Sequence, residues 1–237
     1  AIAKRSMGHV KACNNEESTK LYLVLPVIGL LGYDASDPLE VYPRHETDPV
    51  GKDSRVYRAD FAILTDGKPM IAFGCVKASL DATAKLDEVS GYFKAWPSTR
   101  LGIVTKGIRF DFHVDSGEPG VMDREPFLSL DLETISQSGA SDEILETLNY
   151  ATKSNFDAEM IAEVAHLQLV KKRLRNAFIE EAQAPSEEFC RAMLQRIGFG
   201  GVPKIAIDRH YAPLMKTAFE EALVLPVVHR LKGSPTG

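Results

Sequence analysis

An aspartate, a cysteine and a lysine lie on two neighbouring predicted strands, where together they could serve phosphodiester hydrolysis. Asp60 lies in the apolar run "RADFAIL", whereas Cys75 and Lys77 lie in "MIAFGCVKAS". A strand aspartate and a lysine on one face, supported by a helix glutamate, form the set that a metal-dependent phosphodiesterase needs. Carboxylates hold Mg²⁺, while the metal and the lysine orient a water molecule and offset charge on the phosphate. The alternative is a surface pair of Asp60 and Lys77, with Cys75 as a small core residue.

The turn between the two runs decides which side chains share a face. The sequence "TDGKP" contains an Asp-Gly pair, which favours a two-residue hairpin turn. With such a turn Asp60 lies opposite Phe73 and shares its face with Cys75 and Lys77, because side chains alternate along a strand. A three-residue loop would shift the register by one and put Gly74 and Val76 there instead. A lysine at the site favours the shorter turn.

A buried helix is predicted over "NNEESTKLYLVLPVIGLLGYD", and it would supply the helix glutamate. Asn14 is suited to the N-cap, and Glu17 falls at the third helical position, where its side chain completes a capping box. Glu16 is then the carboxylate that is left free for the site.

The pattern after the hairpin predicts the rest of a mixed sheet. A helical pattern in "DATAKLDEVSGYFKAW" is followed by strands in "RLGIVTKG" and "IRFDFHVD". This order indicates an α/β or α+β fold, with a mixed sheet flanked by helices. After "PFLSLDLETI" the patterns are helical only. We therefore predict two domains, residues 1–135 with the sheet and residues 140–237 with helices alone.

The composition limits the classes of function. With 237 residues, of which 44% are hydrophobic, the chain can bury a sizeable core. Its net charge of -5 argues against a protein that coats nucleic acid nonspecifically, because that affinity comes largely from Lys and Arg on phosphates. No stretch approaches the roughly 20 apolar residues of a membrane span. Three scattered cysteines favour a reducing compartment, and we expect a cytoplasmic protein.

Several blocks of the sequence occur in the order of a known family. They are "NEESTKLYLVLPVIGLLGYD", "DPLEV", "ADFAILTDGKPMIAF", "YFKAWPSTRLGIVTKGIRFDFHVD", "EPGVMDREPFLSLDL" and "FDAEMIAEVA" followed by "PSEEF". The chain resembles the bacterial restriction endonucleases whose nuclease region is similar to the N-terminal region of type I restriction enzyme R subunits. The resemblance covers nearly the whole chain. It implies the PD-(D/E)xK nuclease fold, DNA as substrate, Mg²⁺ or Mn²⁺ as cofactor, and a second copy or a restriction-modification subunit as partner.

The resemblance also assigns roles to residues. The family's helix glutamate matches Glu16, and its first strand acid matches Asp60; both are expected to hold the metal. The family's hairpin ends in Glu-x-Lys, and its next helix carries a Gln-x-x-x-Tyr pair that faces the site. Here that pair reads Glu88 and Tyr92, and Tyr92 is expected to orient a ligand or phosphate.

The sequence departs from the family at the end of the hairpin. Counted from the turn without a gap, the family's glutamate falls on Gly74 and its lysine on Val76. With one extra residue, they fall on Cys75 and Lys77. The strand acid is absent on either count, and a neutral thiol is a poor ligand for a hard cation.

Glu88 offers a replacement for the missing acid. If the Glu88 carboxylate points into the site, the metal ligands are Glu16, Asp60 and Glu88. Lys77 and Tyr92 then complete the predicted catalytic site. Glu88 could instead be a solvated helix charge. Two functions follow from these alternatives: Mg²⁺-dependent hydrolysis of DNA at a rearranged site, or a catalytically inactive nuclease-fold module that binds DNA or a protein partner.

Other patterns are weaker signals of chemistry. Cys75 with His113 lacks a third orienting group for thiol catalysis, and the histidines show no metal-ligand spacing. Walker motifs are absent from the sequence, so ATP-driven translocation is not expected of this chain. The basic run "KKRLR", Lys171 to Arg175, is either a DNA-backbone patch or a solvated helix face.

Overall fold

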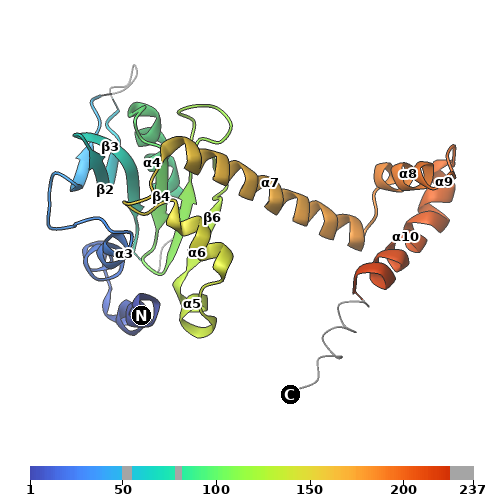
Figure 1. Cartoon of the computed structure of the whole chain (residues 1–237), viewed down its shortest axis with the longest axis horizontal. Coiled ribbons are helices and arrows are strands. Elements are labelled where there is room, and N and C mark those ends of the chain that lie inside the picture. Colours follow the sequence, from blue (N-terminus) through green and yellow to red (C-terminus); the bar gives the residue numbers. More distant parts are fainter. Residues whose placement is uncertain (50–54, 78–81, 225–237) are drawn as a thin grey trace. The chain divides into compact units, whose positions relative to one another are not determined.

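A computed structural model describes residues 1–49, 55–77 and 82–224. The chain divides into two compact units, Ala1–Leu169 and Val170–Gly237. The division falls within helix α7 (Ala158–Gln183), which is continuous in Figure 1. The boundary predicted at residues 135–140 lies inside the first unit, because the first half of α7 packs into the core of that unit.

The first unit contains a six-stranded sheet in which the strands follow one another in chain order. They are β1 (Val41–Glu46), β2 (Arg58–Thr65), β3 (Lys68–Cys75), β4 (Leu101–Thr105), β5 (Arg109–His113) and β6 (Leu128–Asp131). Strands β3 and β4 pair in parallel, and all other neighbours pair antiparallel. A parallel pair needs a crossover, which here is α4 (Thr83–Ala95). The predicted class, a mixed sheet with helices followed by a helical region, is confirmed.

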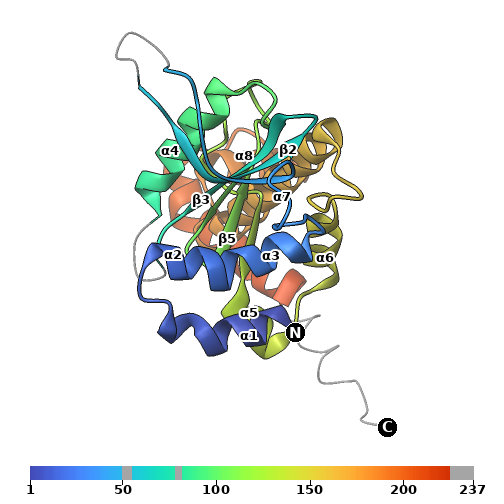
Figure 2. The same cartoon turned by 90° about the vertical axis from the view of Figure 1, so that its left-hand side faces the viewer.

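Helices cover both faces of the sheet. Alternate residues of β3 belong to different cores, with Ile71 and Phe73 in the first and Ala72 in the second. The first core is closed by the N-terminal helices, which include α3 (Leu25–Leu30), by α5 (Leu132–Ser138) and α6 (Asp142–Asn149), and by the first half of α7. The second core lies under α4 and includes Val89 and Phe93. In Figure 2, α3 and α4 accordingly lie on different sides of the strands.

The N-terminal helices follow one another closely. They are α1 (Ile2–His9), the 3-10 turn η1 (Val10–Ala12), α2 (Glu16–Thr19), the π-helical turn η2 (Lys20–Val24) and α3 (Leu25–Leu30). After the sheet come α5 (Leu132–Ser138) and α6 (Asp142–Asn149).

The β2–β3 hairpin has the predicted two-residue turn. Thr65 pairs with Lys68, as expected from the Asp-Gly sequence. Asp66 and Gly67 have φ values of 52° and 73°, and positive φ at both central residues is what this turn type requires.

A bulge lies directly beside this turn, and the sequence pattern did not predict it. Leu64 pairs with Pro69, whereas Ile63 pairs with Ile71, which leaves Met70 as the extra residue. Pro69 has no backbone N–H to donate to the ladder, and sheets confine such residues to edges and bulges.

The bulge shifts the pairing of β2 with β3 by one residue, so that Asp60 does not lie where it was predicted. Beyond it Phe61 pairs with Phe73, so the next residue along β2, Asp60, lies at the level of Gly74. The prediction that Asp60 lies opposite Phe73, with Lys77 on the same face, was therefore wrong. A shift of one residue exchanges the faces on which side chains lie.

The predicted buried helix forms, but its N-terminus differs in detail. The N-cap is Asn15 and not Asn14. Ser18, and not Glu17, completes the capping box: Asn15 Oδ1 accepts from the Ser18 N–H at 2.8 Å, and Ser18 Oγ accepts from the Asn15 N–H at 3.3 Å. Glu17 is therefore free of the cap and, like Glu16, can reach other partners.

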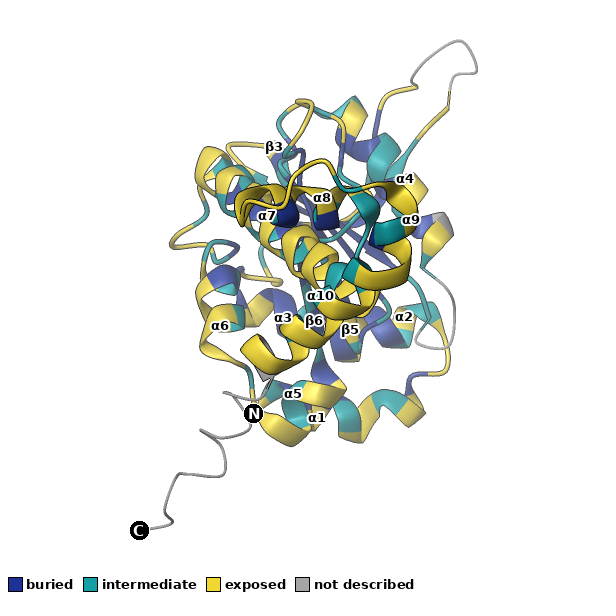
Figure 3. Ribbon diagram, turned by 90° about the vertical axis from the view of Figure 1, so that its right-hand side faces the viewer, coloured by how far each residue is buried: buried dark blue, intermediate teal, exposed yellow. Residues whose placement is uncertain are grey.

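The second unit consists of helices. After α7 these are α8 (Glu187–Arg196), α9 (Lys204–Ala206), the π-helical turn η3 (Ile207–Tyr211), α10 (Ala212–Phe219) and the π-helical turn η4 (Glu220–Val224). Their small core contains Cys190, Leu194 and Ile207. Much of the surface of α8 and α10 is exposed (Figure 3). Among the described residues of the whole chain, no helix has the length and apolar character needed to cross a membrane.

Candidate functional site

The carboxylate of Asp60 is the centre of a buried charge network. Its Oδ2 accepts a hydrogen bond from the backbone N–H of Cys75 at 2.7 Å and lies 3.0 Å from Nζ of Lys85. Its Oδ1 lies 2.8 Å from Nζ of Lys20. None of the Asp60 side chain is exposed, and the side chains of Lys20 and Lys85 are only 7% and 9% exposed. Both carboxylate oxygens are thus paired with cations away from solvent.

Three glutamates complete this network. Nζ of Lys20 lies 2.5 Å from Glu16 and 3.2 Å from Glu17, both of which lie about one helical turn earlier. Nζ of Lys85 lies 2.9 Å from Glu88, which lies one turn later on α4. The two lysines therefore link the strand aspartate to acids on two separate helices.

Charge pairing outweighs burial at Asp60 and at the two lysines. Burial alone would raise the pKa of Asp60, but a backbone N–H and the two ammonium groups lower it below its usual value. Burial would lower the pKa of Lys20, yet the ion pairs with Asp60 and Glu16 raise it well above its usual value. The pKa of Lys85 is likewise raised against the effect of burial, by Glu88 and Asp60. Asp60 and both lysines are therefore charged at neutral pH.

Gly74 occupies the level of the hairpin at which a strand acid would face Asp60. A Cβ atom on Gly74 would lie 2.4 Å from Cγ2 of Val89 and 3.3 Å from Cγ of Lys85. The space beside Gly74 is therefore filled by side chains of α4, and a glutamate there would require Val89 to shift. Of the two positions that the sequence leaves open for the missing acid, the observed register favours Gly74 over Cys75.

Lys77, the predicted catalytic lysine, lies outside this network. It follows β3 and is half-buried, and none of the described residues forms an ion pair with it. The lysines that do contact Asp60, Lys20 and Lys85, were not predicted. Each lies three or four residues from a glutamate, the spacing at which opposite charges meet on a helix, but such pairs are common on helix surfaces and do not indicate a contact with Asp60.

Tyr92 is buried in the second core and forms a hydrogen bond with a histidine. Its hydroxyl lies 2.7 Å from Nδ1 of His45, whose ring packs edge-on against Trp96. Burial raises the pKa of Tyr92 well above its usual value and lowers the pKa of His45. Of the predicted helix pair, the structure thus joins Glu88 to Asp60 through Lys85 but directs the hydroxyl of Tyr92 to His45.

Cys75 has the environment of a core residue. Its side chain is completely buried, and burial, followed by the charge of Asp60, raises the pKa of the thiol well above its usual value. A neutral buried thiol is a poor nucleophile. Cys13 and Cys190 are also free and buried.

The charge network does not fit Mg²⁺ as it stands. The ion takes oxygen ligands at about 2.0–2.1 Å in octahedral geometry. Here both oxygens of Asp60 are paired with ammonium groups, and Glu16 and Glu88 are joined to Asp60 through those lysines. A cation at Asp60 would have to displace at least one ammonium group. In the described parts of the chain, no three His, Cys, Asp or Glu side chains are grouped so as to hold a metal ion.

Comparisons of the chain with protein-family models, with curated proteins and with solved structures found no match. The likeness to restriction endonucleases therefore stays a prediction from the sequence. The geometry of the charge network bears on function independently of that likeness.

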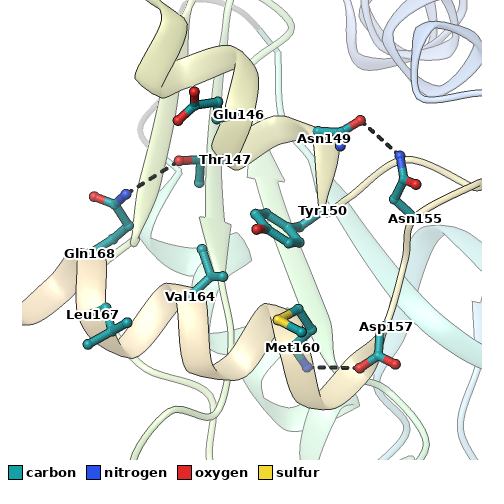
Figure 4. Close-up of a pocket in the computed structure, with 10 residues that line it drawn as sticks. All are labelled: Glu146, Thr147, Asn149, Tyr150, Asn155, Asp157, Met160, Val164, Leu167 and Gln168. Carbon is teal, nitrogen blue, oxygen red and sulfur yellow. Dashed lines mark hydrogen bonds between the residues drawn. The ribbon is translucent and has the colours of Figure 1, made fainter.

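A pocket of about 650 Å³ lies elsewhere in the first unit, between α6 and the first half of α7 (Figure 4). Its lining combines polar side chains with the apolar Met160 and Leu167. At its rim Asn155 donates a hydrogen bond to Asn149 at 2.9 Å. Its lining includes no member of the charge network, so the pocket adds nothing to the predicted site.

Proposed function

We propose that the chain is a catalytically inactive relative of the PD-(D/E)xK nucleases, a nuclease-fold module that binds DNA or a protein partner. The sequence resemblance supports the fold family, and the charge network supports the loss of hydrolysis. The observation that carries the proposal is the pairing of both Asp60 oxygens with lysine ammonium groups inside the protein.

The order of elements supports the nuclease-fold part of this proposal. The helix that carries Glu16 precedes the hairpin that carries Asp60, and α4, which carries Glu88, leads into the parallel strand β4. The resemblance implies the same succession of helix glutamate, strand aspartate and helix polar residue. The three acids belong to one network, as expected if they occupy the positions of a nuclease site.

The loss of hydrolysis follows from what an ammonium group can do. A metal ion lowers the pKa of a bound water molecule and polarises a phosphoryl oxygen. A protonated lysine neutralises a carboxylate but coordinates no water for attack. Because the pKa values of Lys20 and Lys85 are raised, both lysines keep their protons at neutral pH. The acids are therefore held in place without a group that activates water.

A hydrolytic alternative is favoured by one observation, the convergence of the three predicted metal ligands around two lysines. If Mg²⁺ displaced Lys20 or Lys85, those acids could ligate it, and the released lysine could contact the phosphate. Metal binding would then have to exceed the cost of breaking a buried ion pair, about 3–5 kcal/mol.

Cleavage and metal-binding assays decide between the two. The chain and its Asp60→Asn variant are incubated with supercoiled and linear DNA in Mg²⁺ or Mn²⁺, and Mn²⁺ binding is measured by calorimetry. We expect no cleavage above that of the variant and no Mn²⁺ binding. Metal-dependent cleavage that disappears in Asp60→Asn would overturn the proposal.

Binding is measured separately from cleavage. The fluorescence anisotropy of a labelled DNA duplex is followed at increasing salt concentration. Binding that weakens steeply with salt supports a DNA-binding module, because salt competes with contacts to phosphate. Absence of binding at low salt would show that the chain is not a DNA-binding module, and a protein partner would be the one that the proposal still allows.

A further inference from the structure

The second half of α7 carries an apolar stripe on its surface. The buried residues of this helix all precede Val170. From there Val170, Leu174 and Phe178 follow at intervals of four residues, which places them along one side of the helix. Leu174 and Phe178 are 53% and 60% exposed. An apolar stripe of this kind is typical of a helix that packs against a partner.

The charges beside the stripe indicate which partner fits. Arg173 and Glu180 lie seven residues apart, about two helical turns, so both border the same edge of the stripe. When two such helices pair antiparallel, the arginine of each copy meets the glutamate of the other. Parallel pairing in register would leave both charges without an opposite charge across the contact. Ala177 lies about midway between them, and its small side chain allows close approach at the centre.

We propose that residues 170–183 of α7 pair antiparallel with the same residues of a second copy of the chain. Leu174 of one copy then packs against Ala177 and Phe178 of the other, flanked by two pairs of Arg173 with Glu180. A two-fold contact of this type is self-complementary and closes as a dimer. Arg173 also has a partner within its own chain, so the intermolecular pair forms in exchange for that contact.

The size of the contact sets the strength of association. The segment is about 20 Å long at a rise of 1.5 Å per residue. A contact between two helices of this length is smaller than a standard stable interface, so the dimer should form on the order of micromolar concentrations.

Sedimentation velocity of the full chain between about 1 and 100 µM tests the proposal. We expect a monomer–dimer equilibrium that Arg173→Glu and Glu180→Arg each weaken by about tenfold, because each substitution brings like charges together twice. The double variant restores both pairs and should return the dissociation constant to within about threefold of the wild-type value. Arg175→Glu, an equal change of charge outside the paired edge, is the matched control.

A single cysteine provides a second measurement. The native cysteines are buried, so Ala177→Cys should form a disulfide-linked dimer under mild oxidation, whereas Asn176→Cys, on the opposite side of the helix, should not. Circular dichroism checks that each variant keeps its helices. A chain that stays monomeric over the whole concentration range, or a double variant that does not recover, would overturn the proposal.

Discussion

Replacement of Asp60 by asparagine distinguishes a structural charge network from a metal site, because the two predict opposite changes in stability. In a metal site without its ion, clustered carboxylates repel one another, and removal of one leaves stability unchanged or raised. In the network described above, the carboxylate is the shared partner of two buried ammonium groups. Its removal should therefore destabilise the fold.

The size of the effect follows from the contacts of Asp60. An asparagine fits the same space, and its carbonyl oxygen can still accept the N–H of Cys75. Its amide group, however, donates hydrogen bonds and would face a lysine that also donates. Loss of one partner of a buried ion pair costs about 3–5 kcal/mol. Because Lys20 and Lys85 keep their glutamate contacts, we expect the lower end, about 3 kcal/mol.

Urea unfolding followed by tryptophan fluorescence measures this loss. Trp96 is the chain's one tryptophan and lies in the first unit, so its emission reports on the unit that contains the network. With a slope of about 1–3 kcal/mol per molar urea, the midpoint should fall by roughly 1–3 M. Asp66→Asn, an exposed aspartate in the turn of the same hairpin, is the matched control and should change stability by less than about 0.5 kcal/mol. The reasoning is refuted if Asp60→Asn is as stable as this control or more stable than the wild-type chain.

Three further results are expected. Gly74→Ala places a Cβ atom 2.4 Å from Val89 and should cost about 1–3 kcal/mol in urea unfolding, most of which Gly74→Ala with Val89→Ala should recover. Cys75 should stay unmodified by a chromogenic thiol reagent until the protein unfolds, because burial raises its pKa; rapid modification of the native chain would contradict its place in the core. The stabilisation due to Asp60 should be fully present above its usual pKa of 3.8 and be lost as the pH falls through the lowered folded value. The difference in unfolding free energy between wild type and Asp60→Asn, measured from acid to neutral pH, should therefore vanish at low pH. A difference that is independent of pH would contradict the lowered pKa of Asp60. The raised pKa of Lys20 acts in the opposite direction. The stabilisation of the fold by Lys20 is complete below pH 10.5, its usual pKa, and is lost only as the pH rises through the higher pKa of the folded chain.

Local sequence patterns predicted β2, β3, β4 and β5 but not β6, and not the exact pairing between the strands. The Asp-Gly turn is decided by two residues, and it formed as predicted. The bulge depends on how all of β3 aligns with β2, and a proline beside a turn is equally compatible with an unbroken edge. The division between the two units differs from the predicted domain boundary for a similar reason. Whether Ile161 of α7 is buried depends on tertiary packing against the first core, which a helical period alone does not show.

The acids of the candidate site were easier to predict than its cations. Glu16, Asp60 and Glu88 were named from the sequence, and the structure brings all three into one network. Lys20 and Lys85 were missed because each has a glutamate one turn away on its own helix, which is a common surface pair. Their additional contact with a buried aspartate joins residues far apart in the sequence, and no local pattern contains that information.

Gly74 and Lys85 lie side by side, so the residue that each position can hold is limited by the side chain at the other. The stem of Lys85 lies 3.3 Å from where a Cβ atom of residue 74 would be, so an acid side chain there would compete with it for space. An added acid would also bring another negative charge beside Asp60, which the ammonium groups now neutralise. Removal of Lys85 alone would leave Asp60 with one buried cation fewer, and addition of an acid alone would clash with Val89. A metal site could therefore form here only through at least two simultaneous changes, because each single change is opposed by packing or by an unpaired buried charge. If the chain is the inactive nuclease relative proposed above, this mutual dependence explains how Asp60 is kept in the folded core, with Glu16 and Glu88 joined to it through the lysines.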